Sequence, residues 1–181
     1  MDKPKIEVID LPPVISNELP ERKIVFSDEE QRAHRRLKTP LWQYLWHSPF
    51  LVVLSAPLIY ICLIPFLLLD AFVSIYQRVC FPIYGIPTVQ RGRYFIFDRG
   101  KLHYLNLLER INCSYCSYAN GLIAYVAEVA GRTEQHWCPI KHSRNAPKQH
   151  SRYSKFLPYG DAAAYRAHLK EVEVAFDDLN H

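Results

Sequence analysis

The chain has 181 residues, 49% of them hydrophobic, and a formal net charge of +4 at pH 7. This length has room for one modest domain beside a membrane anchor and argues against a large enzyme. The six glycines are scattered, so no glycine-rich loop can hold a nucleotide, and the paired-carboxylate and nucleophile-elbow signatures of common hydrolases are missing.

The first 38 residues predict a flexible tail with a basic end. Prolines recur in residues 1 to about 30 without helical or strand periodicity, which is typical of irregular chain. Basic side chains then gather just before the apolar part of the chain, at Arg32, Arg35, Arg36 and Lys38. We assign no function to this tail.

Residues 39–83 predict a membrane anchor. No Asp, Glu, Lys or Arg lies between Lys38 and Asp70, and Phe50 to Leu69 supplies the roughly 20 apolar residues that a helix needs to cross a bilayer. Pro57 and Pro65 interrupt this run, so we expect a kinked helix or a helical hairpin that re-enters the membrane. Two buried core helices of a soluble protein are the alternative.

A second, one-sided helix is expected directly after Leu69. Asp70, Ser74, Gln77 and Arg78 fall at i, i+4, i+7 and i+8, and apolar residues fill the other positions. Such a helix fits the membrane interface, with Trp42, Tyr44 and Trp46 as an aromatic belt at the opposite end. Nearly equal basic counts on both sides favour a hairpin with both ends in the cytoplasm, and a single pass remains open.

Residues 84–181 predict a small, mainly helical domain. A short aromatic strand is expected at 93–97 and helices at 101–111 and 122–134, the latter two packed antiparallel around a turn at Asn120-Gly121. Asp161 is a good N-cap for a third helix, whose apolar stripe runs to Leu179. The predicted fold class is thus mainly α: an N-terminal anchoring helix or helical hairpin, then a small Cys/His-containing helical domain with at most one short strand or hairpin.

A second group of basic residues follows without an acidic neighbour between Glu134 and Asp161: Lys141, Arg144, Lys148, Arg152 and Lys155. Lys and Arg near a cytoplasmic leaflet gain roughly 1 kcal/mol each from anionic lipids, so the lipid bilayer is the expected partner of this body. A solvated loop is the alternative. We expect no nucleic-acid partner, because no aromatic-interleaved basic stripe or binding motif accompanies the charge.

Four soft ligands suggest a metal site. Cys113 and Cys116 form a Cys-x-x-Cys pair, and Cys138 and His142 frame a proline-restrained knuckle. Thiolate and imidazole are the ligands of closed tetrahedral zinc sites, and a gap of two residues lets two thiolates reach one ion. The sequence therefore predicts a metal site at Cys113, Cys116, Cys138 and His142, with zinc as the expected cofactor and iron as the alternative.

Two other interpretations of the cysteines stay open. A helix at 122–134 would separate the two ligand pairs, and an antiparallel hairpin would instead bring His103 to Cys138 and His142. Cys113 and Cys116 could also form a redox-active dithiol, although oxidoreductases place that motif at a helix start after a strand.

The segments Asn112-Cys-Ser-Tyr-Cys-Ser-Tyr-Ala-Asn-Gly-Leu-Ile-Ala-Tyr and Arg132-Thr-Glu-Gln-His-Trp-Cys-Pro-Ile-Lys-His142 resemble motifs of a family of uncharacterised bacterial membrane-associated proteins. The resemblance runs from about Asp70 through the third expected helix. It implies a bacterial inner-membrane setting and transfers no activity to this chain.

The leading functional hypothesis is a membrane-anchored protein with a cytoplasmic Cys/His metal-binding domain, which acts through a membrane protein partner. The first alternative is a membrane-tethered Cys-x-x-Cys redox protein. The second is a non-catalytic assembly factor or subunit of a membrane complex.

Overall fold

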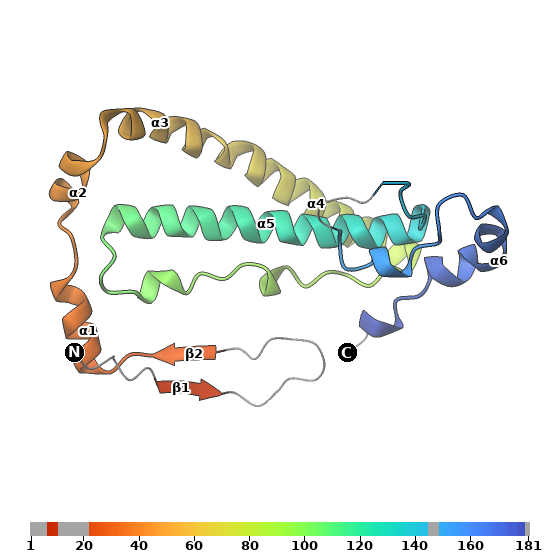
Figure 1. Ribbon diagram of the computed structural model, residues 1–181, viewed down its shortest axis with the longest axis horizontal. Coiled ribbons are helices and arrows are strands. Elements are labelled where there is room, and N and C mark those ends of the chain that lie inside the picture. Colours follow the sequence, from red (N-terminus) through yellow and green to blue (C-terminus); the bar gives the residue numbers. More distant parts are fainter. Residues whose placement is uncertain (1–6, 11–21, 145–148, 180–181) are drawn as a thin grey trace. The chain divides into compact units, whose positions relative to one another are not determined.

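The computed structural model describes residues 7–10, 22–144 and 149–179, and this part of the chain is mainly helical, as predicted (Figure 1). Its chain contacts divide it into two compact units: residues 1–55 with 97–114, and residues 56–96 with 115–180. The elements are β1 (Glu7–Asp10), β2 (Arg22–Val25), α1 (Asp28–Arg36), α2 (Leu41–His47), α3 (Phe50–Ile61), α4 (Leu63–Tyr84), η1 (Arg91–Arg93), η2 (Arg99–Lys101), α5 (Leu107–Trp137), η3 (Tyr153–Lys155), α6 (Ala162–Glu173) and η4 (Asp177–Leu179).

The first unit holds an antiparallel strand pair, β1 and β2, within the segment predicted as a tail. A single short strand pair agrees with the predicted fold class, but its place differs, because residues 93–97 form no strand. The rest of the predicted tail, 1–6 and 11–21, lies outside the described residues. α1 begins with a reciprocal capping box, in which the Ser27 hydroxyl accepts from the Glu30 amide and the Glu30 carboxylate accepts from the Ser27 amide.

The predicted anchor is one long helical rod, α3 followed directly by α4. Among the described residues, one helix, Phe50–Tyr84, is long and apolar enough to cross a membrane. Its short break at Cys62 has a local cause: Pro65 has no amide hydrogen for the Ile61 carbonyl, and its ring crowds that oxygen. The chain continues in the same direction through the break, so of the two predicted forms, a kinked helix or a re-entrant hairpin, the hairpin does not form.

α5 is a single helix of 31 residues where the sequence predicted two antiparallel helices. Its start is set by a second capping box, with Asn106 Oδ1 3.0 Å from the Glu109 amide and Glu109 Oε2 2.8 Å from the Asn106 amide. The expected turn at Asn120-Gly121 is helical instead. Gly121 is needed there because a Cβ would overlap the backbone carbonyl of Tyr94, so this glycine allows a close approach and not a turn.

In the second unit, α4 and α5 run side by side in the same direction (Figure 1). Tyr115 of α5 donates to the Ile59 carbonyl at one end of the pair, and His136 stacks on Tyr84 at the other. Residues 86–96, the return segment, pass back along both helices. The core between these elements contains Phe81, Ile86, Val89, Leu122, Tyr125, Val129 and Phe176.

The third predicted helix is confirmed as α6, with Asp161 as its N-cap. The Asp161 carboxylate accepts from the Ala164 amide at 2.9 Å, and Gly160 takes the left-handed conformation before it at φ 81°. α6 ends at Glu173, before the end of the predicted stripe. Phe176 therefore reaches the core from the chain beyond the helix.

Gly121→Ala tests the close packing of the return segment on α5. Alanine favours a helix interior over glycine by about 1 kcal/mol, but the overlap with the Tyr94 carbonyl should reverse that gain and destabilise the fold by about 1–3 kcal/mol. Urea unfolding in mild detergent measures the change. Gly92→Ala is the control, since no atom lies within 4 Å of its Cβ position. A Gly121→Ala protein more stable than the parent would contradict the packing.

Candidate functional site

The structure does not bring the four predicted metal ligands together. Cys113 and Cys116 lie inside α5, whereas Cys138 and His142 follow its end. The helix rise alone places Cys116 about 33 Å from Cys138. Among residues 7–10, 22–144 and 149–179, no three His, Cys, Asp or Glu side chains are arranged to hold a metal ion.

The alternative metal site that includes His103 does not form either, because it depended on an antiparallel helical hairpin. His103 precedes α5 and Cys138 follows it, so a continuous helix takes the place of that hairpin. Zinc or iron binding stays a prediction without a formed site in the described part of the chain.

The Cys113-x-x-Cys116 pair does not have the setting of a redox dithiol. All five cysteines are free thiols, and Cys113 is the seventh residue of α5. The helix dipole acts within the first turn, so it does not reach either thiol in the way it does in oxidoreductases.

The end of α5 gathers a cluster of ionisable side chains around Glu134. His150 Nε2 lies 2.9 Å from one carboxylate oxygen, and His142 Nε2 lies 3.9 Å from the other. His150 Nδ1 accepts from the Arg152 amide at 3.2 Å, so the ring proton sits on Nε2 and is donated to Glu134. The cluster thus includes one predicted metal ligand, His142. Its other two members, Glu134 and His150, were not predicted to belong to a site.

An apolar groove of about 480 Å³ adjoins this cluster between α4 and α5. Glu134 and Cys138 line it together with Val73, Tyr76, Val126, Val129, Ala130, Thr133 and Trp137. Partial desolvation of the sulfur, and to a smaller extent the Glu134 carboxylate, raise the pKa of the Cys138 thiol. Cys138 is therefore protonated at neutral pH, which is the opposite of what an activated nucleophile requires.

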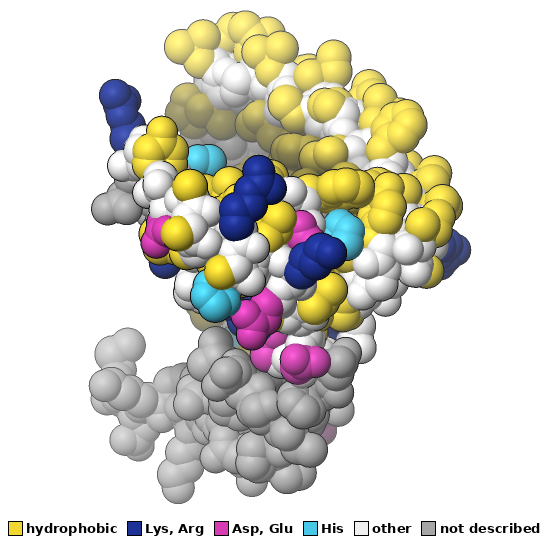
Figure 2. Space-filling view, turned by 90° about the vertical axis from the view of Figure 1, so that its right-hand side faces the viewer, with side chains coloured by type: hydrophobic (Ala, Val, Ile, Leu, Met, Phe, Trp, Pro, Cys, Tyr) yellow, Lys and Arg dark blue, Asp and Glu magenta, His cyan; other side chains and the backbone are white. Residues whose placement is uncertain are grey.

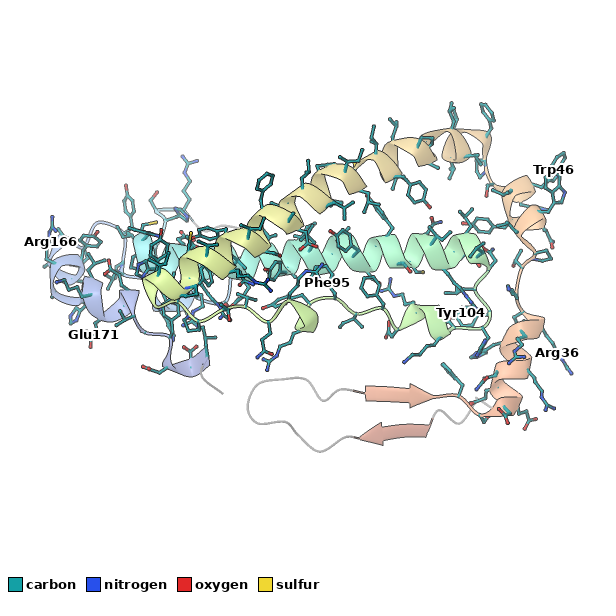
Figure 3. The ribbon with its side chains drawn as sticks, turned by 180° about the vertical axis from the view of Figure 1, so that it is seen from behind. Arg36, Trp46, Phe95, Tyr104, Arg166 and Glu171 are labelled. Carbon is teal, nitrogen blue, oxygen red and sulfur yellow. The ribbon has the colours of Figure 1, made fainter. Side chains whose placement is uncertain are left out.

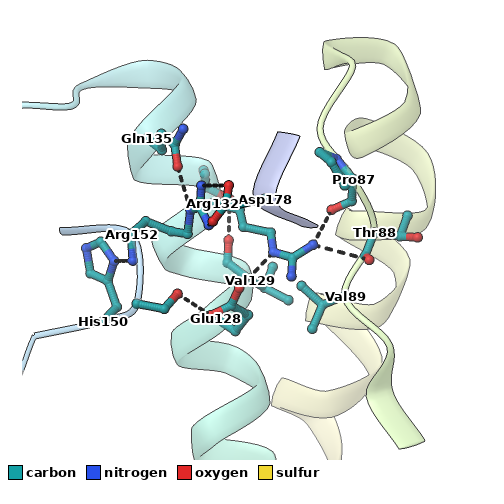
Figure 4. Close-up of polar contacts among 12 residues, drawn as sticks. Pro87, Thr88, Val89, Glu128, Val129, Arg132, Gln135, His150, Arg152 and Asp178 are labelled. Carbon is teal, nitrogen blue, oxygen red and sulfur yellow. Dashed lines mark hydrogen bonds and ion pairs between the residues drawn. The ribbon is translucent and has the colours of Figure 1, made fainter. Parts of the chain in front are cut away.

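Arg152 is buried, with only 3% of its surface exposed. Its hydrogen bonds connect the C-terminal segment to α5 (Figure 4). Its guanidinium donates to Gln135 Oε1 at 2.6 Å and to both carboxylate oxygens of Asp178 at 2.7 and 2.9 Å. Lys155 also donates to Asp178. These hydrogen bonds, the one from Arg152 first, hold the pKa of Asp178 well below its ordinary value although burial opposes them.

The basic group predicted to face lipid is therefore only partly available for that role. Arg152 and Lys155 are engaged with Asp178, because a buried guanidinium needs a charged partner inside the protein. Lys148 lies outside the described residues. No local sequence signal reveals the Arg152–Asp178 pair, which joins residues 26 positions apart.

Three of the four residues in the predicted polar stripe of α4, Asp70, Ser74 and Gln77, are covered by protein, whereas the fourth, Arg78, is exposed. Asp70 accepts from Arg91 Nε at 3.0 Å and from the Tyr118 hydroxyl at 3.0 Å. Gln77 donates to the Tyr125 hydroxyl at 2.8 Å and exchanges hydrogen bonds with the backbone of Val89. Asp70, Ser74 and Gln77 thus face α5 and the return segment, where lipid headgroups had been expected.

Comparison of the chain with protein-family models, with curated proteins and with solved structures finds no match.

Asp178→Asn tests the role of the Arg152 network. The pKa of the Asp178 carboxyl is lower in the folded chain than in the unfolded chain. Its contribution to the free energy of unfolding is therefore complete above the unfolded pKa of about 3.9 and is lost as the pH falls below that value. At pH 7 the variant should lose at least about 1 kcal/mol, a modest figure because solvent screens this half-exposed group. Urea unfolding of both proteins from pH 7 to pH 3 should show the difference shrinking. A constant difference would exclude the ion pair as its cause.

Metal analysis tests the four-ligand site. If α5 stays continuous, purified protein should hold less than about half an equivalent of zinc or iron, because a closed site needs all of its ligands on one ion. Cys113→Ser and Cys138→Ser should leave that content unchanged. One equivalent lost in both variants would show that α5 opens or that two chains share the ion.

Proposed function

We propose that this chain is a membrane-bound protein without a reaction of its own, which acts as an assembly factor or subunit through contact with partner proteins. The observation that carries the proposal is the Phe50–Tyr84 helix, whose most apolar 18-residue window is wholly unburied. A core helix of a soluble protein would be covered by other elements. Here α3 and the outer face of α4 present apolar side chains outward.

The exposed surface is too apolar to face water. Leu51, Leu58 and Phe72 are exposed to 73%, 70% and 69%, and their neighbours along the rod are similarly open. Contiguous apolar patches on soluble proteins rarely exceed a few hundred Å². Figure 2 shows the same contrast on one face, with largely apolar side chains above and most charged side chains gathered below.

A partner-binding role is favoured because the ionisable groups of the second unit serve the fold. Asp70 binds Arg91 and Tyr118, Arg152 binds Asp178, and Glu134 binds His150. Buried charges that are paired in this way hold segments in register. The alternative function, in which a Cys/His metal-binding domain acts through partners, has less support, because the predicted metal ligands are dispersed along α5 and beyond it.

We assign the chain to a bacterial inner membrane, with the second unit in the cytoplasm. The five free cysteines suit a reducing compartment. α2 adds an interfacial element: Trp42 and Trp46 are 72% and 75% exposed, and Trp46 points away from its helix (Figure 3). Exposed tryptophans are enriched where a membrane meets water.

Membrane fractionation tests this function. The chain should sediment with membranes, resist high salt and alkaline carbonate, and dissolve in mild detergent. Leu68→Glu, which places a charge on the exposed side of α4, should move the protein to the soluble fraction. Leu107→Glu is the control, since Leu107 is exposed to 64%, against 54% for Leu68, but lies on α5. Parent protein that remains in a detergent-free supernatant would refute the proposal.

A partner should then co-purify in detergent at a fixed ratio to the chain. Cys113→Ser and Cys138→Ser should leave this ratio unchanged, because neither thiol has a role in the proposed contact. Loss of the complex in both variants would instead support the metal-binding alternative.

A further inference from the structure

We infer that α4 lies along the membrane surface, in the plane of one leaflet, and does not cross the bilayer. The acyl chains of that leaflet cover the outer face of α4. This inference rests on the proposed membrane association and adds to it the orientation of the anchor and the identity of the surface that lipid covers.

The outer face of the rod is apolar from the end of α3 to the end of α4. Seven side chains share it at helical spacing, and each is at least half exposed: Ile61, Ile64, Leu68, Phe72, Ile75, Val79 and Ile83. They extend over about 33 Å at 1.5 Å per residue. Four of them lie beyond Asp70, where a span of Phe50–Leu69 would already have left the hydrocarbon.

The inner face of α4 carries its hydrogen-bonding polar side chains beside core residues such as Phe81, and protein covers it. Asp70, Ser74 and Gln77 point to α5, where Tyr118 and Tyr125 are their hydrogen-bond partners. α4 therefore has one apolar side and one protein-covered side along its whole length. This is the pattern of a helix that lies in an interface, about 5–10 Å into the leaflet.

α5 makes a perpendicular crossing costly, because it accompanies the rod from Ile59 to Tyr84. A hydrocarbon slab about 30 Å thick and centred on Ile59 is also centred near Tyr115. Arg110 precedes Tyr115 by five residues of the same helix, or about 7.5 Å, and so falls inside that slab. A charge at that depth is strongly disfavoured.

Shifting the slab along the rod does not remove the problem. A slab centred on Asp70 contains Arg91, whose side chain is 46% exposed beside it. A slab over the C-terminal half of α4 contains Glu128 and Arg132 of α5, which pack beside residues 87 and 88 of the return segment. When α4 lies in the plane, these charges are on the side away from the acyl chains.

The charges near the outer face suit an anionic leaflet. Arg78 is exposed and lies about 100° around the helix from Val79, which places it at the edge of the apolar face. The one acidic residue of α4, Asp70, is on the covered side and is neutralised by Arg91. The headgroups of anionic lipids attract a cationic side chain that lies beside an apolar face, as Arg78 does.

Spin-label depth measurements test the orientation. Single cysteines replace Ile64, Phe72, Val79 and Ile83 in a background whose five native cysteines are serine, in vesicles of zwitterionic and anionic phospholipid. The ratio of two collision rates reports the depth of each label. One is the rate of collision with oxygen, which concentrates in the bilayer, and the other is the rate of collision with a water-soluble nickel reagent. An in-plane α4 predicts one common depth, whereas a crossing predicts a change of about 28 Å between Ile64 and Ile83. Glu171→Cys, on α6 of the same unit, is the water-exposed reference, since the Glu171 side chain is charged and 79% exposed.

The outcomes separate the two proposals. A depth that changes steadily along α4 overturns the in-plane orientation and leaves membrane binding intact. Labels that are all water-accessible overturn membrane binding itself.

A second measurement needs no cysteine change, in case the serine background fails to fold. Tags at residues 1 and 181 of the parent chain should be cleaved by protease from the same side of sealed vesicles. Cleavage from opposite sides would show a crossing.

Discussion

Three polar side chains on one face of an apolar helix impose the main constraint on the second unit. Asp70, Ser74 and Gln77 cannot face lipid or an apolar core without hydrogen-bond partners, because an unpaired polar group in such surroundings costs several kcal/mol. α5 and the return segment supply those partners through Tyr118, Tyr125, Arg91 and Val89. This requirement decides which face of α4 packs on α5 and the return segment.

Tyrosine suits this contact because its ring is apolar and its hydroxyl is polar. Tyr125 is fully buried, with its ring in the core and its hydroxyl on Gln77, and Tyr115 reaches the Ile59 carbonyl from a ring packed on Tyr60. Phe95 of the return segment, labelled in Figure 3, also packs on the Tyr118 ring. Apolar packing and polar satisfaction are thus supplied by the same residues, so the contact is specific as well as stable.

The second polar network acts at the other end of α5. Arg152, Gln135 and Asp178 join the C-terminal segment to the helix, while Glu134 and its two histidines remain near the surface beside the apolar groove. The unit therefore separates an apolar outer side on α4 from a charged side around α5. That separation is the physical basis for a membrane-bound role, since it matches a boundary between acyl chains and water.

Local patterns in the sequence were enough to predict the long apolar helix, its polar stripe, the cap at Asp161 and the mainly helical class. These features depend on helical periodicity and on side chains bonding to their own backbone, which neighbouring residues determine. Tertiary contacts decided what covers the stripe, why Gly121 sits inside a helix and why Arg152 is buried. Tyr118 meets Asp70 from 48 positions away, and no local pattern encodes such a pairing. The predicted ligand cluster failed to form for the same reason: Cys116 and Cys138 could meet only if α5 broke between them, and the contacts of Gly121 and Tyr125 with distant segments keep it continuous.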